Sequence, residues 1–296
     1  MKILNFGSLN IDHVYKVKTF VKPGETIAAL DYSRFPGGKG LNQSIALARA
    51  GAPVSHAGKI GADGAFLRDI LVQSGVDCSL LLFAKNEPTG HAVIQVSAEG
   101  ENCIVLFGGA NRTISQEQIR STFLSAAPGD FLLLQNEISA MPEIIRCAAD
   151  KKMRIFLNPA PMNDAVNKLP LELIDTFIVN EIEAAGLAGV SENPEPESIL
   201  GSLGKKYQSA NVLMTWGAAG AMYLDKNGGK PIFVPASRVE KAVDTTAAGD
   251  TFIGYFLAET ALGKTAEESM ETAAKAAAIC VSRPGAAVSI PFRNEL

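Results

Sequence analysis

The segment from residue 131 to residue 215 repeats one pattern four times: FLLLQ at 131–135, IFLN at 155–158, FIVN at 177–180 and VLMT at 212–215. Each run is short, almost wholly apolar, and ends in a polar residue. A strand of a parallel sheet that is buried on both faces has this composition. Ile3–Phe6 adds a fifth run of the same kind near the start of the chain.

Segments with helical periodicity separate the apolar runs. The signals are an apolar stripe at Leu41, Ile45 and Ala48 that Gly51 ends, a capping box at Ser115 and Gln118, and an alanine-rich run from Thr265 to Ser282 before Pro284. Strands that alternate with helices predict a three-layer α/β/α fold with a mainly parallel sheet.

Two regions break this alternation. Residues 14–35 and 89–107 contain strand-like runs around turn signals, and they predict a small antiparallel sheet attached to the α/β body as a lid or dimer surface. The acidic, proline-containing stretch Ser191–Ser198 is predicted to be a surface loop. The chain is otherwise continuous, so residues 1–296 are expected to form a single domain.

The composition argues against a nucleic-acid-binding, zinc-binding or membrane-spanning protein. The chain has 296 residues, 47% of them hydrophobic and 20% charged, with a net charge of -4 that is mixed along the sequence. No basic run could follow a phosphate backbone, so nucleic acid is an unexpected partner. The four cysteines form no CxxC pair and the three histidines have no zinc-ligand spacing. No apolar run is long enough for a membrane span or a signal peptide, so the cytoplasm is the expected location.

Polar residues recur where the predicted strands end. Asn10 and Asp12 follow the first strand, and the later strands are followed by Glu137, Asn158, Asn180 with Glu183, and Thr215 with Gly217. Ligands of open α/β sheets bind beyond the carboxyl ends of the strands. These side chains therefore predict one site, although each of them alone could be a turn residue or a helix cap.

The sequence DTTAAGDTF at 244–252 is the strongest chemical motif. Small residues lead into a helix that begins near Asp250, and a helix start offers unpaired N–H groups to an anion. A carboxylate at the same place can accept a proton from an attacking hydroxyl, as phosphoryl transfer requires. The local spacing alone favours the alternative that Asp250 is a simple helix cap.

Two glycine-rich segments are less specific. GGKGLN at 37–42 is neither a Walker A loop nor GxGxxG, and it can be a turn into a helix or a grip by Lys39 and Asn42 on a ligand rich in hydroxyls. TWGAAG at 215–220 is by itself a turn between two strands.

The ordered set of motifs resembles the ribokinase-like carbohydrate kinase family from about Gly7 to Arg293. The segments that support the resemblance are GSLNIDH at 7–13, PGET at 23–26, GGKG at 37–40 with Asn42 and Gln43, GEN at 100–102, GAN at 109–111, NPAP at 158–161, Asn180 with Glu181 and Glu183, residues 244–252, Arg283, Gly285 with Ala286, and Ser289. No single segment is decisive, but their order is specific.

The resemblance implies a role for each matching residue. Asp250 is similar to the catalytic base of the family, and Ala247, Ala248 and Gly249 resemble its anion hole. The positions similar to the sugar site are Asn10, Asp12, Gly38, Lys39, Asn42 and Glu137. Those similar to the nucleotide site are Asn180, Thr215, Trp216, Gly217, Ala218, Ala219, Gly220, Gly249 and Ala274. Glu183, with Asn180, resembles a residue that orders Mg²⁺ through water. The positions similar to a monovalent-cation loop, usually filled by K⁺, are Asp244, Thr246, Cys280, Arg283, Gly285 and Ser289.

The resemblance therefore implies ATP-dependent phosphorylation of the primary hydroxyl of a sugar, with D-ribose as the expected substrate, and a homodimer formed through the lid. Asp12 and Asn10 can bond two neighbouring hydroxyls, which favours ribose over 2-deoxyribose. A kinase of the same family for fructose, deoxyribose or a nucleoside is the nearest alternative. A catalytically silent sugar-binding protein on the same fold is another. A nucleotide-dependent oxidoreductase is disfavoured, because the first strand is not followed by GxGxxG.

Overall fold

The computed structural model describes residues 1–190 and 195–296 and is built on a nine-stranded sheet in the order β13-β12-β11-β10-β9-β8-β1-β4-β5. The strands are β1 (Ile3–Phe6), β4 (Val54–Ile60), β5 (Leu81–Phe83), β8 (Phe131–Gln135), β9 (Arg154–Asn158), β10 (Thr176–Asn180), β11 (Asn211–Trp216), β12 (Gly220–Leu224) and β13 (Ile232–Pro235). All neighbours from β11 to β5 are parallel, and β12 and β13 add an antiparallel edge. The mainly parallel sheet is therefore confirmed, and each of the five predicted runs is a strand.

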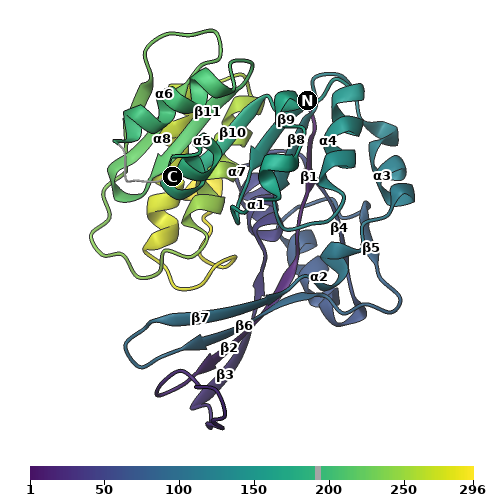
Figure 1. Cartoon of the computed structure of the whole chain (residues 1–296), viewed down its shortest axis with the longest axis vertical. Helices are drawn as coiled ribbons and strands as arrows, with labels where there is room; N and C mark the ends of the chain where they lie inside the picture. Colours follow the sequence, from purple (N-terminus) through teal and green to yellow (C-terminus); the bar gives the residue numbers. More distant parts are fainter. Residues whose placement is uncertain (191–194) are drawn as a thin grey trace.

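Helices cover both faces of this sheet, as Figure 1 shows. The helices are α1 (Lys39–Arg49), α2 (Ala65–Gln73), α3 (Gln116–Thr122), α4 (Met141–Asp150), α5 (Glu181–Ala188), α6 (Pro196–Lys206), α7 (Ala248–Ala261) and α8 (Ala266–Val281). Along β8, Phe131 and Leu133 pack into the core with α1, α2, α7 and α8, whereas Leu132 and Leu134 pack into the core with α3 to α6. Since successive side chains of a strand point to opposite faces, the doubly buried sequence FLLLQ produces the three-layer arrangement.

The predicted helix starts are confirmed with one difference. Thr265 caps α8 in a full capping box with Glu268. Ser115 caps α3 by accepting the Gln118 N–H, but the Gln118 side chain donates to the Gly58 carbonyl at 2.7 Å. Only half of that predicted box therefore forms, because burial gives the Gln118 amide another backbone partner.

The lid is a second sheet of four strands, β2 (Asn10–Lys16), β3 (Asp31–Gly37), β6 (Gly90–Val96) and β7 (Asn102–Phe107), in the order β3-β2-β6-β7. Figure 1 shows it projecting from one end of the α/β body. Both outer pairings are antiparallel, and the central pairing of β2 with β6, which joins two hairpins from distant parts of the chain, is parallel. On β7, Ile104 and Val105 are exposed.

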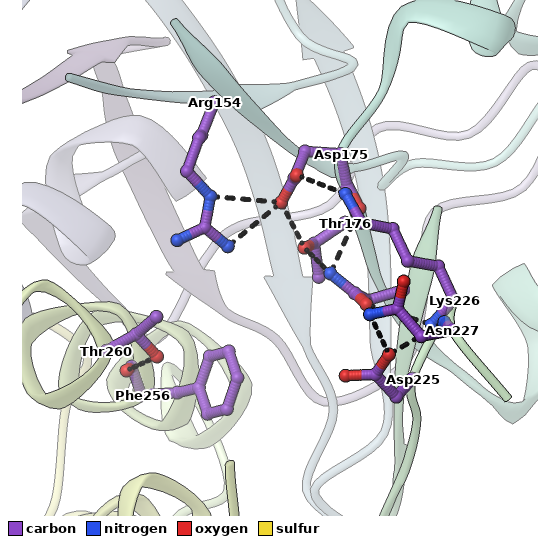
Figure 2. Close-up of polar contacts among 9 residues, drawn as sticks. Arg154, Asp175, Thr176, Asp225, Lys226, Asn227, Phe256 and Thr260 are labelled. Atoms are coloured by element: carbon purple, nitrogen blue, oxygen red, sulfur yellow. Dashed lines mark hydrogen bonds and ion pairs between the residues drawn. The ribbon is translucent and has the colours of Figure 1, made fainter. Parts of the chain in front are cut away.

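An ion-pair cluster lies at the amino ends of the central strands, shown in Figure 2. Asp175, just before β10, pairs with Arg154 at 3.1 Å and with Lys226 at 3.0 Å. The Arg154 guanidinium also lies over the rings of Phe131 and Phe156. This cluster ties three strands together at the edge of the sheet that is opposite to the predicted site.

The acidic stretch differs from its prediction. Residues 191–194 of the predicted loop lie outside the described residues, but Pro196–Ser198 form the first turn of α6. A proline is well suited to a first helical turn because its missing N–H would be unpaired there anyway. In the described ranges, no helix has the length and apolar character needed to cross a membrane.

Candidate active site

A cavity of about 220 Å³ lies at the carboxyl ends of β9, β10 and β11. It is lined by Lys39, Asn158, Ile178, Val179, Asn180, Glu183, Thr215, Thr245, Ala247, Gly249, Asp250 and Ile253. A larger hollow of about 520 Å³ lies beside the ends of α5 and α6, but among the described residues that line it only Glu172 and Lys206 are charged. The smaller cavity gathers the chemically competent groups, so we take it as the candidate active site.

Asp250 is the third residue of α7 and is held from another helix. Its carboxylate accepts the Asn42 Nδ2 hydrogen bond at 3.0 Å and the Gln43 Nε2 hydrogen bond at 2.8 Å, both from α1. No side chain caps α7. The alternative that Asp250 is only a helix cap is therefore wrong: each carboxylate oxygen binds an amide of α1.

The start of α7 presents free donors to the cavity. Ala247, the residue before the helix, has the left-handed backbone conformation with φ 62°. Of the N–H groups at 247–250, only that of Ala248 meets an acceptor within the described part of the chain, the Thr245 carbonyl at 3.2 Å. A Cβ at Gly249 would meet open space. The remaining N–H groups and the helix dipole therefore suit an anion close to the backbone.

Lys39 and Glu137 lie on the lid side of Asp250. The negative charge of Asp250 is the largest cause that raises the pKa of the Lys39 ammonium, although burial acts against it. Glu137, in the loop after β8, accepts the Lys39 N–H at 3.1 Å and the hydroxyl of Ser8. Gly38 precedes α1 with φ 95°, a conformation that favours glycine.

Asn10 and Asp12 lie on β2 at the base of the lid. Asn10 Oδ1 accepts a hydrogen bond from Asn111 Nδ2 at 2.8 Å, which orients the Asn10 amide. Asp12 pairs with Phe35 in the strand, so the alternative of a turn residue is wrong. Burial, with a contribution from the charge of Glu137, raises the pKa of Asp12 to about 6.

Asn180 and Glu183 form a capping box at the start of α5. The Glu183 carboxylate accepts the Asn180 N–H at 3.1 Å, the Asn180 Nδ2 at 3.1 Å and the Asn158 Nδ2 at 3.2 Å. Burial raises the pKa of Glu183, although these hydrogen bonds oppose the shift. Because both oxygens already accept amide N–H groups, this carboxylate is better placed to bind metal-held water than to coordinate a metal directly.

The other positions of the predicted nucleotide site are spread out. Thr215 lines the cavity, and Trp216 ends β11. Gly217, Ala218 and Ala219 form an exposed turn, and Gly220 begins β12. Ala274 on α8 is packed into the apolar core and does not line the cavity.

The positions of the predicted cation loop do come together. The backbone of Val243 and Asp244 bonds to the Val281 carbonyl, and the Asp244 carboxylate accepts the Thr246 and Gly285 N–H groups, both at 2.9 Å. The Cys280 thiol lies 3.1 Å from Ser289 Oγ and 3.7 Å from the Thr246 carbonyl. The Arg283 N–H bonds to the Cys280 carbonyl. Residues 243–246 and 280–289 thus contact each other beside the start of α7.

Sequence reasoning gave no role to Gln43 or Gln135, and it placed Asn158 in the site without a specific role. Gln43 bonds Asp250 directly, and Asn158 links Gln43 to Glu183. Gln135, the last residue of β8, bonds Gln43. The available signal was local: Gln43 follows Asn42, and Gln135 is a polar end to an apolar strand. Only the contact between α1 and the strand ends reveals their connection.

Known proteins share the sequence and the fold of this chain. The model of the pfkB family carbohydrate kinases matches residues 1–293. The chain is 38% identical over 294 residues to a ribokinase of Haemophilus influenzae, an alignment that covers 98% of this chain and 95% of the relative.

Solved structures agree. A ribokinase of Arabidopsis thaliana complexed with ribose and ATP has a TM-score of 0.88 at 31% identity, covering 99% of this chain and 96% of the other. A ribokinase of Cryptococcus neoformans in complex with ADP has a TM-score of 0.88 at 32% identity, covering 99% and 98%. With its fold, its cavity and nearly its whole length matched, the chain belongs to the pfkB family of carbohydrate kinases.

Proposed function

We propose that this protein transfers the γ-phosphoryl group of ATP to the primary hydroxyl of D-ribose. The observation that supports this most is the carboxylate of Asp250, held by two amides beside unpaired N–H groups at the start of α7. The complex of a related ribokinase with ribose and ATP supports the two substrates. We take residues 1–296 as one kinase domain.

Asp250 would remove the proton from the attacking hydroxyl as the oxygen begins to bond to phosphorus. The free N–H groups of Ala247 and Gly249, joined by that of Ala248 once it leaves the Thr245 carbonyl, would hold the charge on the transferring phosphoryl oxygens. The Lys39 ammonium nearby would assist them. The side chains of Asn10, Asp12, Asn42 and Glu137, with Gly38 and Lys39 at the base of the lid, would hold the sugar. Asn180, Thr215 and the turn at 217–220 would hold the nucleotide, with the adenine approaching α8 near Ala274.

Two cations fit the residues present. Glu183 and Asn180 would orient the waters of a Mg²⁺ ion, which neutralises phosphate charge when it is bound. The oxygens of Asp244, Thr246, Cys280, Arg283, Gly285 and Ser289 would hold K⁺, a cation suited to carbonyl ligands. This loop runs directly into Ala247, so turnover should rise when K⁺ replaces tetramethylammonium. An unchanged rate would argue against the loop.

The sugar assignment is tested by ATP turnover against ribose, 2-deoxyribose, fructose and common nucleosides, with Mg²⁺ and K⁺ present. A preference for ribose over 2-deoxyribose is expected, because a site built to bond a hydroxyl leaves polar groups unpaired when that hydroxyl is missing. A preference for another sugar would move the specificity within the family. No turnover with any of them would favour a silent sugar-binding protein.

We further propose a homodimer through the lid. On β7 the side chain of Val105 is 67% exposed and that of Ile104 is 54% exposed, which is unusual for neighbouring apolar residues of one strand. Light scattering of the purified protein should give twice the chain mass, and Val105→Glu should reduce it to the monomer. A wild-type monomer would refute the proposal. The four free cysteines are consistent with the cytoplasm, which we propose as the location.

A further inference from the structure

Gln43 makes three hydrogen bonds while its side chain is fully buried. It lies on α1, and its Nε2 donates to Asp250 Oδ1 at 2.8 Å and to Asn158 Oδ1 at 3.3 Å. Its Oε1 accepts a hydrogen bond from Gln135 Nε2 at 2.6 Å. Both N–H groups and the carbonyl oxygen of the amide are therefore used, and Gln43 does not line the cavity.

The direction of the Gln43 amide is determined by its neighbours. Gln135 Nε2 also donates to Asn5 Oδ1 at 3.0 Å, so the nitrogen of Gln135 must face both Gln43 and Asn5. Asn5 Nδ2 in turn donates to the Gly40 carbonyl and to Ser44 Oγ, both at 2.8 Å. If Gln43 were flipped, its nitrogen would face the Gln135 nitrogen and its oxygen would face the Asp250 carboxylate.

The chain of hydrogen bonds ends at a buried imidazole. Ser44 Oγ lies 2.8 Å from His56 Nδ1. Burial lowers the pKa of His56 to about 4, so the ring is neutral and its Nδ1 can accept the Ser44 hydroxyl. The array connects Asp250 on α7 to β8, β1 and β4 through side chains that solvent does not reach. The assigned orientation pairs both N–H groups and the carbonyl oxygen of Gln43, whereas a flipped Gln43 amide would set like groups against Gln135 and Asp250.

We propose that Gln43 is a positioning residue that fixes the plane of the Asp250 carboxylate, and that Gln135 locks Gln43 in the orientation that allows this. The inference rests on the proposed function, since it assigns how the base of that reaction is aimed. Asn42 holds Oδ2 and Gln43 holds Oδ1, so the carboxylate cannot rotate without breaking one of the two hydrogen bonds. Removal of Gln43 frees that rotation. It also removes one hydrogen bond to the cavity-lining Asn158, whose bonds to the Ile178 carbonyl and to Glu183 remain.

The experiment measures kcat and KM for ribose and ATP in Gln43→Met and Gln43→Glu, with wild type and Asp250→Asn alongside. Gln118→Leu is the matched control: Gln118 is also a buried glutamine, 2% exposed, but its amide donates to Gly58 and not to the Asp250 network. Melting temperatures of all variants separate loss of fold from loss of rate.

For Gln43→Met we expect kcat to fall by about 10- to 100-fold, the order of loss from small misplacement of a reacting group. Both KM values should stay within about threefold, since Gln43 itself does not line the cavity. Gln118→Leu should lower the melting temperature and leave kcat unchanged. A folded Gln43→Met variant with near wild-type kcat, or with a raised KM and unchanged kcat, overturns the proposal.

Gln43→Glu keeps the shape and decides the matter if Gln43→Met does not fold. Two carboxyl groups in contact resist joint ionisation. In the plot of kcat against pH, the midpoint on the acid side should therefore lie at a higher pH for Gln43→Glu than for wild type. The other charged groups coupled to Asp250, Lys39 and Glu183, are the same in both proteins. An unmoved midpoint overturns the proposal. If wild type itself turns over no sugar, the proposed function fails, which is distinct from an active wild type whose Gln43 variants are normal.

Discussion

Asp250→Asn should remove most of the turnover and little of the fold. The Asp250 carboxylate offers one oxygen to Asn42 and one to Gln43, whereas an asparagine has a single oxygen. One of the two amide donors then faces an NH₂ group, which costs roughly 1–3 kcal/mol of stability for a buried unpaired donor. A protein stable by about 5–15 kcal/mol remains folded at 25 °C after this loss.

The effect on the rate is larger than the effect on the fold. Loss of general-base catalysis lowers kcat by about 10²–10⁴-fold. At about 1.36 kcal/mol per decade this is roughly 3–5 kcal/mol of activation free energy. ATP affinity should be unchanged, because the replacement alters neither the backbone N–H groups of 247–249 nor the contacts of Asn180.

The assay follows ADP formation from ATP and ribose, with calorimetric titration of ATP and a thermal melt on the same samples. Asp175→Asn is the control, because it also alters a carboxylate with fixed partners but lies at the opposite edge of the sheet. That control should melt earlier and retain its kcat. A folded Asp250→Asn variant that keeps more than a tenth of the wild-type kcat would refute Asp250 as the base.

Two further predictions follow from the pKa shifts. Burial and the charge of Glu137 raise the pKa of Asp12 to about 6, so its carboxylate is charged above that pH and protonated below it. We therefore expect kcat/KM for ribose to fall as the pH drops through about 6. In Asp12→Asn, kcat/KM should be low at every pH and should not show this fall, and a variant that still shows it would contradict the assignment. Burial alone would raise the pKa of Asp175, but hydrogen bonds and charge from Lys226 and Arg154 outweigh it and lower that pKa, so its stabilisation is present above pH about 4 and lost as pH falls through the lower folded value. Asp175→Ala should lower the free energy of unfolding in urea by about 1–3 kcal/mol at pH 7, less than for a fully buried pair because the partners of Asp175 are partly exposed. The difference from wild type should shrink near pH 3. A difference that does not depend on pH would contradict this account.

The fold was largely predictable because its signals are local. The apolar runs at 131–135 and 177–180 are too short for helices and too apolar for a sheet with one solvent-exposed face. They therefore predict a parallel sheet that is covered by helices on both faces. The start of α6 was mispredicted because Ser191–Ser198 is rich in loop-forming residues and the helix begins inside it. The parallel pairing of β2 with β6 joins distant segments of the chain, and no local pattern predicts it.

The candidate site was also predictable only in part. Residue patterns along the chain were enough to predict the three-layer class, the helix start near Asp250 and the polar residues at the strand ends, because these depend on neighbours along the chain. The bonds of Asp250 to Asn42 and Gln43, in place of a cap on its own helix, result from the packing of distant elements. The packing also decided that Gln135 and Asn5 orient Gln43, because these contacts join residues about 90 to 210 positions apart and arise from packing α1 against α7 and against the sheet. A hydrogen bond depends on where two side chains meet in space, and local sequence does not encode that distance.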